Sequence, residues 1–187
     1  MKEIEILTEV LDDKEKALAI LNKLNFIGFK ETFDVYFFDP LRQDLKPNKE
    51  GGLDRCFRLR QKDDKSFLAY KIDRFDEKGI WLYSDEHEIE VSGFETTIEI
   101  LKHLGMEILV EIENKKHTFL TDKYEIVLEE VKNLGLFLEV ECLEINNDGK
   151  VVETKKEIWN FIQSLGIKTG EELNTGKPEL MLKKHVS

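Results

Sequence analysis

Pairs of like charges separated by a single residue recur along this chain. Three pairs are acidic and one is basic, and each lies in a run with the character of a β-strand: Glu3-Ile4-Glu5, Glu88-Ile89-Glu90, Glu139-Val140-Glu141 and Phe57-Arg58-Leu59-Arg60. Successive side chains of a strand point to opposite faces, so both charges of a pair share one face and the apolar residue takes the other. The pattern therefore predicts strands with one charged face and one apolar face.

The charged faces have two interpretations. Half-exposed antiparallel strands normally alternate in this way, so any single pair fits an edge strand whose polar face lies in water. Four such strands in one chain favour a barrel in which the charged faces converge on the lumen and helices cover the apolar faces outside. A lumen of carboxylates and guanidinium groups suits a polyanion that is bound together with divalent metal ions. In a purely structural alternative, the acid pairs only keep the lumen hydrated.

The glutamate pairs belong to a repeated unit. Each is followed by a segment with helical spacing that ends at a glycine, the usual cap just past a helix, at 13–28, 95–105 and 152–166. Strands joined mainly by hairpins are expected at about 2–9, 29–39, 54–62, 66–73, 80–91, 106–113, 116–121, 124–131 and 136–144. Many antiparallel strands with helices packed outside predict an α+β barrel or a strongly curved sheet.

Composition narrows the class of protein. The chain has 187 residues and no composition break that would mark a linker, so one domain over 1–187 is expected. A net charge of −11 argues against a sequence-independent nucleic-acid binder, whose affinity comes largely from phosphate neutralisation. There is no secretory signal and no apolar run long enough to span a bilayer, so we expect a cytoplasmic protein without a membrane partner. Cys56 and Cys142 lack metal-ligand spacing and are expected to be reduced thiols.

In their order along the chain, these pairs resemble the motifs of the CYTH superfamily, also called the triphosphate tunnel metalloenzymes. The matching segments are Glu3-x-Glu5, Arg58-x-Arg60, Tyr70-Lys71, Glu88-x-Glu90, Glu129-x-Val131 and Gly135-x-Phe137-x-Glu139-x-Glu141. The resemblance runs to about residue 145, and 84–90 and 134–141 are most similar to the class IV adenylyl cyclase-like branch. It implies an eight-stranded antiparallel β-barrel, closed or nearly closed, with helices packed outside.

The resemblance also implies roles for the basic residues. Arg58 and Arg60 would offer planar donor forks to phosphate oxygens, and Lys71 would add a point charge from the neighbouring strand. Lys116 would serve a third wall of the tunnel. Arg58 and Lys71 are the candidate catalytic residues, and all four bases are candidate substrate-binding residues.

The acidic residues are the candidate ligands of Mg²⁺ or Mn²⁺. Glu88 and Glu90 would bind metal or orient the basic residues, and we count them with the substrate-binding group. The expected metal ligands are Glu3, Glu5, Glu129, Glu139 and Glu141, which offer hard oxygen donors. These acids outnumber the four bases, so the empty tunnel would be repulsive unless cations enter or some carboxylates stay protonated. A divalent metal is therefore expected.

The sequence departs from the family pattern in three places. The first motif is normally Glu-x-Glu-x-Lys, and Leu7 stands in the lysine position. A Lys-x-Arg pair usually precedes an aromatic residue, but here Asn114 and Lys116 precede Phe119, and Lys115 would compensate only if the strand bulges. The usual C-terminal serine-tyrosine element is missing, and Lys177-Pro178 lies roughly where it would be expected. Each lost contact to a charged group would weaken binding by about 1.5–3 kcal/mol.

Three functions remain open at this point. The first is a metal-dependent enzyme of the class IV adenylyl cyclase type, which converts ATP to cyclic AMP and pyrophosphate. The second is a triphosphatase that hydrolyses an inorganic or organic triphosphate, such as thiamine triphosphate. The third is a non-catalytic module that binds a nucleotide or polyphosphate. Barrel edges and outer helices offer surfaces for a homodimer, although no heptad or exposed apolar stripe requires one.

Overall fold

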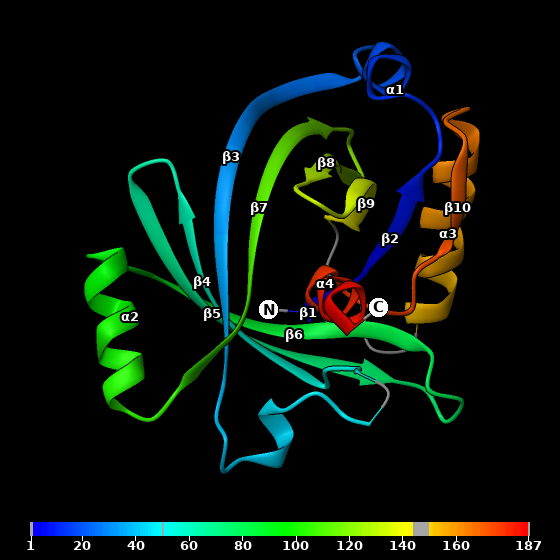
Figure 1. Cartoon of the computed structure of the whole chain (residues 1–187). Helices are drawn as coiled ribbons and strands as arrows, with labels where there is room; N and C mark the ends of the chain where they lie inside the picture. The colour runs from blue at the N-terminus through cyan, green and yellow to red at the C-terminus, as the bar shows by residue number, and fades with distance from the viewer. Residues whose placement is uncertain (1, 50, 144–149, 187) are drawn as a thin grey trace.

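The computed structural model describes residues 2–49, 51–143 and 150–186 and consists of a curled sheet with helices around it (Figure 1). Position 144, at the end of an expected strand, and both ends of the expected domain lie outside this range. The strands are β1 Lys2–Glu3, β2 Glu5–Val10, β3 Asn25–Phe38, β4 Arg55–Lys62, β5 Lys65–Phe75, β6 Trp81–Val91, β7 Glu107–Leu120, β8 Tyr124–Val131, β9 Gly135–Cys142 and β10 Thr169–Glu172. The helices are α1 Lys14–Leu21, α2 Phe94–His103, α3 Val151–Ser164, α4 Lys177–Val186 and the 3₁₀-helix η1 Gln43–Leu45.

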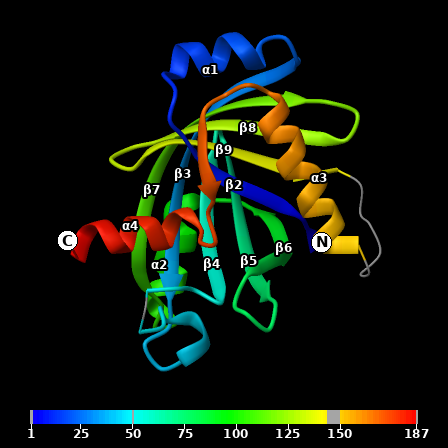
Figure 2. The same ribbon diagram turned by 90° about the vertical axis from the view of Figure 1, so that its right-hand side faces the viewer.

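The strands form one antiparallel sheet, and the N-terminal segment closes it. The strand order is β1-β6-β5-β4-β3-β7-β8-β9-β2-β10. Because β1 pairs with β6 while β2 pairs with β9, residues 2–10 join the two sides of the sheet. The short β10 pairs with the edge of β2 that does not pair with β9, and β6 pairs with β1 instead (Figure 2). The predicted α+β antiparallel barrel is therefore confirmed.

The strand count differs from the expected eight. The described sheet has ten strands, because the N-terminal strand is interrupted at Ile4 and because Thr169–Glu172 adds a short strand that the sequence pattern did not predict. The strands expected at 106–113 and 116–121 are one long strand, β7, which curves with β3 around the barrel (Figure 1). Asp63-Asp64 forms the turn that joins β4 to β5, and Asp63 has a positive φ of 55° there.

Helices cover the apolar outer face of the barrel. Helices α1 and α3 pack on β2, β8 and β9 in a cluster that includes Ala17, Leu21, Ile126, Ile158 and Ile162. Helix α2 packs on β3 and β4 in a second cluster that includes Val35, Phe37, Phe94, Ile98 and Leu101. Each such side chain stabilises the fold by about 1.5–3 kcal/mol when fully buried. Burial of these residues turns the charged positions between them toward the lumen.

The apolar residue within each charged pair tests the predicted alternation. Ile4, Leu59 and Val140 are at most 4% exposed and belong to these two clusters. Ile89 is 61% exposed, so the third acid pair does not lie above a core. The alternation therefore identifies the faces of three segments and only part of the fourth.

Helix α4 lies within the ring of strands when the barrel is viewed end-on (Figure 1). Met181 packs there in a third apolar cluster with Leu7, Tyr36, Val131 and Phe137. One region of the barrel interior is thus apolar and filled by α4, whereas the rest carries the charged residues. Within the described ranges, no helix combines the length and the apolar character needed to cross a membrane.

Candidate functional site

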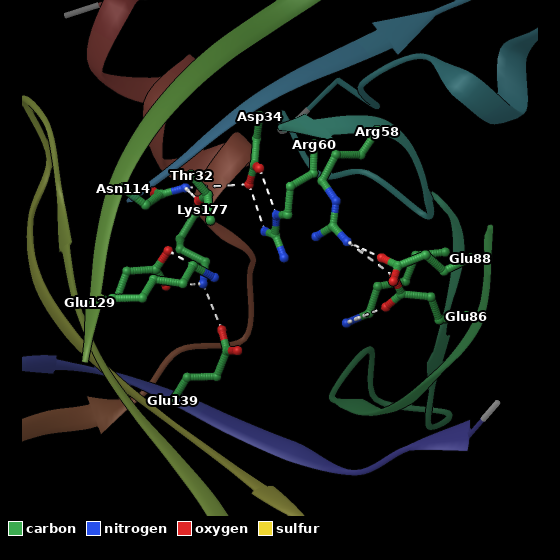
Figure 3. Close-up of polar contacts among 12 residues, drawn as sticks. Thr32, Asp34, Arg58, Arg60, Glu86, Glu88, Asn114, Glu129, Glu139 and Lys177 are labelled. Atoms are coloured by element: carbon green, nitrogen blue, oxygen red, sulfur yellow. Dashed lines mark hydrogen bonds and ion pairs between the residues drawn. The ribbon is translucent and has the colours of Figure 1, made fainter. Parts of the chain in front are cut away.

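A cavity of about 1270 Å³ occupies the barrel interior. This volume exceeds the 300–1,000 Å³ that is typical of small-molecule sites. All predicted site residues line it except Glu90 and Glu129, and its charged lining includes Glu3, Glu5, Arg58, Arg60, Lys71, Glu86, Glu88, Lys116, Glu125, Glu139, Glu141 and Lys177. The charged faces of the predicted strands therefore do converge in one space (Figure 3).

Arg60 is held by an aspartate that the sequence analysis did not select. Its Nε and Nη2 atoms each donate a hydrogen bond of 2.7 Å to the carboxylate of Asp34, which is 2% exposed. Burial alone would raise the pKa of Asp34, but the Arg60 guanidinium outweighs it and keeps that pKa well below its usual range. Asn114 donates to Asp34 Oδ2 at 3.3 Å and to Thr32 Oγ1 at 3.1 Å. Arg60 is thus locked in one orientation with its Nη1 group unused by Asp34.

Arg58 and Lys71 contact acids on the opposite side of the cavity. Arg58 Nη2 lies 3.1 Å from Glu86 and 3.3 Å from Glu88. Lys71 Nζ lies 3.0 Å from Glu3 and 2.9 Å from Glu5. The Nε atom of Arg58 is buried and has no hydrogen-bond partner among the described residues. Arg58 is therefore held by the acids of β6 through its Nη2 atom.

The acid pair that faces the lumen from β6 is Glu86 and Glu88, two residues earlier than the expected Glu88 and Glu90. Glu90 pairs with Lys65 at 2.8 Å, is 53% exposed and lies outside the cavity lining. Glu86, which precedes the expected pair on the same face, has a side chain only 10% exposed and contacts Arg58. The structure thus places Glu86 and Glu88 in the lumen. Glu90 lies near the β4–β5 hairpin, where the end of β6 pairs with the start of β5.

Glu129 lies behind the cavity wall between two lysines. It is fully buried, with Lys116 Nζ 3.2 Å from one carboxylate oxygen and Lys177 Nζ 2.5 Å from the other. Lys177 also lies 2.6 Å from Glu139 (Figure 3). Burial would raise the pKa values of Glu129 and Glu139, but the two lysines lower both, that of Glu139 to well below its usual range. Lys177 comes from α4, so strand alternation could not have predicted it.

A row of carboxylates crosses three neighbouring strands without a cation in its middle. Glu141 on β9 is the cross-strand partner of Glu5 on β2 and of Glu125 on β8. Among the described residues, the side chains of Glu141 and Glu125 form no hydrogen bond and no ion pair. Burial, followed by Glu3 and Glu5, raises the pKa of Glu141 to about 8. Burial likewise raises the pKa of Glu3 to about 7, although Lys71 opposes the shift.

The donor chemistry of this row fits a hard divalent cation. Like charges directly opposite on neighbouring strands are destabilising, and an added cation would remove that repulsion. In the part of the chain that the structure describes, no three acidic, histidine or cysteine side chains are already grouped to hold a metal ion. The oxygen ligands are therefore present on adjacent strands, and a metal would have to draw them together.

Two of the three departures from the family pattern, at Leu7 and Asn114, lie in different surroundings. Leu7 is the cross-strand partner of Glu139 and packs in the apolar cluster beside Met181. Asn114 is 3% exposed and supports Asp34, whereas Lys115 is exposed and lies 3.8 Å from Glu31. The strand does not bulge at this point, since 114–120 pair in regular register with β8, so Lys115 does not replace the missing cation.

Fold and site together define a β-tunnel protein, in which an antiparallel barrel encloses oppositely charged walls. The chain matches the CYTH domain over residues 1–176. It is 32% identical over 162 residues to a protein of Methanocaldococcus jannaschii named "putative adenylate cyclase", and the match covers 84% of this chain and 87% of that protein. The chain therefore belongs to the CYTH family.

Solved structures share the fold. The PH1819 protein of Pyrococcus horikoshii has a TM-score of 0.82 at 23% identity, with 97% of this chain and 99% of that chain covered. A Hippeastrum protein, described as a "putative adenylyl cyclase" with a dominant triphosphatase activity, has a TM-score of 0.68 at 16% identity, with 97% and 96% covered. These likenesses extend over nearly the whole of each chain.

Proposed function

We propose that this protein is a metal-dependent enzyme that acts on a triphosphate held in the tunnel. The observation that carries the proposal is the common cavity, which is lined by Arg58, Arg60 and Lys116 together with Glu139 and Glu141. A triphosphate needs several donors along its chain, and its remaining charge favours a divalent cation between it and an acidic wall.

The basic wall accounts for binding of the phosphate chain. Arg58 and Arg60 project from the same face of β4, and a guanidinium can bind two phosphate oxygens at once. Asp34 fixes the orientation of Arg60, so little side-chain freedom is lost when phosphate binds. Arg58 lines the cavity beside Arg60, and Lys71 adds charge from the neighbouring strand.

The acidic wall accounts for the metal. Glu141, Glu5 and Glu139, with Glu125 on the next strand, would hold Mg²⁺ or Mn²⁺. When bound, such an ion neutralises phosphate charge and lowers the pKa of the attacking oxygen. Glu3 and Glu86 stay with the basic residues and hold Lys71 and Arg58 in place.

The first candidate reaction is that of a class IV adenylyl cyclase. The ribose 3′-oxygen would lose its proton to solvent and form a bond to the α-phosphorus. The bond between the α-phosphorus and the oxygen that bridges it to the β-phosphate would break, and pyrophosphate would leave with that oxygen. Arg58 and Lys71 would stabilise the charge that develops on the phosphate oxygens. The relative in Methanocaldococcus named "putative adenylate cyclase" supports this choice.

Hydrolysis of a triphosphate is the second candidate. Water would then attack the terminal phosphorus, with the same residues binding the phosphate chain. The Hippeastrum protein of the same fold is described as having a dominant triphosphatase activity. In addition, Leu7 and Asn114 leave the barrel strands with fewer cations than the family pattern has, so the strands make fewer contacts with the phosphate chain.

Product analysis separates the two reactions. The protein is incubated with ATP and either Mg²⁺ or Mn²⁺, and the nucleotides and phosphates are separated by chromatography. The cyclase assignment predicts equal amounts of cyclic AMP and pyrophosphate, whereas orthophosphate in place of cyclic AMP would select hydrolysis. Absence of any product from ATP and from tripolyphosphate with both metals would contradict an enzymatic function.

Two variants control this assay. Glu139→Gln with Glu141→Gln should abolish turnover, because it removes two carboxylates from the acidic wall. Glu153→Gln with Glu157→Gln removes the same charge from the exposed side of α3 and should keep wild-type activity. Equal activity in the two double variants would exclude the lumen as the active site.

A further inference from the structure

Lys177 differs in origin from the other cations that contact the lumen acids. Arg58, Lys71 and Lys116 are carried by strands of the barrel, whereas Lys177 is the first residue of α4. Its ammonium lies 2.5 Å from Glu129 and 2.6 Å from Glu139, and its side chain is 13% exposed. Burial would lower the pKa of Lys177, but Glu129 and Glu139 outweigh this effect and raise the pKa above its ordinary value. The lysine is therefore charged.

The segment that carries Lys177 is anchored on both sides of the barrel. Leu173 N–H donates to the carbonyl of Leu7 at 2.8 Å. The side chain of Asn174 accepts from Trp81 N–H at 2.5 Å and donates to the carbonyl of Gly79 at 2.8 Å, which ties it to the β5–β6 hairpin. These contacts set the position of Lys177 at the entrance of α4 into the barrel.

The barrel itself offers Glu139 no cation on the side of β2. The residue opposite Glu139 on β2 is Leu7, which packs in the apolar cluster with Met181 of α4. Lys177 approaches from that same helix and supplies the missing positive charge. The same helix, α4, therefore packs against Leu7 and neutralises Glu139.

We propose that Lys177 is a built-in occupant of the acidic wall that a divalent cation must displace from Glu139. This inference rests on the proposed function, because it assigns Glu139 to the metal site. Glu139 lies two residues from Glu141 on the same strand face, so a dication bound by both would lie close to the Lys177 ammonium. Repulsion between the two in a largely buried site favours release of Lys177.

Displacement would give Lys177 a second role. Once it leaves Glu139, the ammonium remains in the cavity on the anchored segment and can pair with an oxygen of the phosphate chain. Binding of the cation is thereby coupled to a shift at the first turn of α4. Metal alone should bind weakly, and metal together with a triphosphate should bind more tightly.

Manganese binding without substrate tests the competition. Mn²⁺ affinity is measured by calorimetry for the wild type, for Lys177→Gln and for Lys156→Gln, which removes an exposed charge of α3. Lys177→Gln should bind Mn²⁺ about tenfold more tightly, because the competing charge is gone, whereas Lys156→Gln should match the wild type. Equal or weaker binding by Lys177→Gln would overturn the proposal.

A measurement on the wild type does not depend on folding of that variant. Amide hydrogen exchange over residues 173–182 should become faster when Mn²⁺ is added, while exchange in α3 stays unchanged. Unchanged or slower exchange over 173–182 at saturating Mn²⁺ would contradict displacement of Lys177.

A third variant separates failure of this inference from failure of the proposed function. If the wild type binds Mn²⁺, Glu141→Gln loses it and Lys177→Gln equals the wild type, the metal site stands and only the role of Lys177 is wrong. If neither the wild type nor Lys177→Gln binds Mn²⁺ in the absence or presence of tripolyphosphate, the metal-dependent function itself is wrong, and this inference with it.

Discussion

Glu139 and Glu141 lie on the same face of β9, two residues apart, and yet they differ in their electrostatic surroundings. Lys177, together with Lys116, holds the pKa of Glu139 well below its usual range. Glu141 is flanked across the strands by Glu5 and Glu125, and burial with the neighbouring acids raises its pKa to about 8. One region of the tunnel is therefore neutralised by the chain's own lysines and the other is not.

The difference indicates where an anion and where a cation would bind most favourably. A buried charge is tolerated when it is paired, and removal of its partner is strongly destabilising. The Arg60–Asp34 pair of the basic wall is ready to receive an anion without large rearrangement. The uncompensated row around Glu141 is stabilised either by protons or by an added cation. Phosphate is therefore assigned to the wall that carries Arg60, and the metal to the wall that carries Glu141.

The largest effect is expected in the basic region. Arg58→Ala should weaken tripolyphosphate binding by roughly 10–100-fold, because a charge-assisted contact with phosphate is lost. Arg42→Ala is the matched control, since Arg42 pairs with Asp44 at 2.7 Å and lies outside the cavity lining. Calorimetric titration of both variants checks the prediction. Equal losses would mean that the basic wall has been assigned to the wrong face of β4.

A smaller effect is expected from pH in the acidic region. The folded-state pKa values of Glu3 and Glu141, about 7 and about 8, exceed the ordinary value of 4.5 for glutamate, so the folded protein binds more protons than the unfolded chain over this pH range. Stability should accordingly fall as pH rises from about 5 to about 8 in metal-free buffer. Solvent screening limits the loss to about 1–2 kcal/mol.

Urea unfolding at several pH values measures this loss. Glu141→Gln should flatten the dependence, because the amide does not titrate. Mn²⁺ should stabilise the wild type more at pH 8 than at pH 6, since metal and protons compete for the same oxygens. A wild type whose stability rises steadily over this range would contradict the assignment of Glu141 as the uncompensated acid.

Strand alternation predicted which residues lie on the lumen face of a strand. It did not predict how far along the barrel each of them lies. It placed Arg58, Arg60, Glu139 and Glu141 correctly, since a period of two fixes the face of a strand. The same period could not show that Glu90 lies near a hairpin end while Glu86 lies inside, because both share one face of β6. Depth depends on the register between strands, which the pattern of a single strand does not contain.

Other site residues were missed for different reasons. Asp34 alternates with Thr32 and Tyr36 on the inner face of β3, but it is a single charge, so the pattern of charged pairs does not reveal it. Lys177 lies at the start of a helix, and only tertiary packing of α4 brings it to Glu129 and Glu139. The split of the first strand at Ile4 likewise depends on its pairing with both β6 and β9.

The most direct test of the two-walled tunnel is metal-dependent binding of tripolyphosphate. Calorimetry compares the wild type with Glu139→Gln/Glu141→Gln, each with Mn²⁺ and with a chelator. The wild type should bind at least about tenfold more tightly with Mn²⁺, and the variant should fold normally but lose this gain. A folded variant that keeps the full Mn²⁺-dependent gain would contradict the assignment of the metal to the acidic wall.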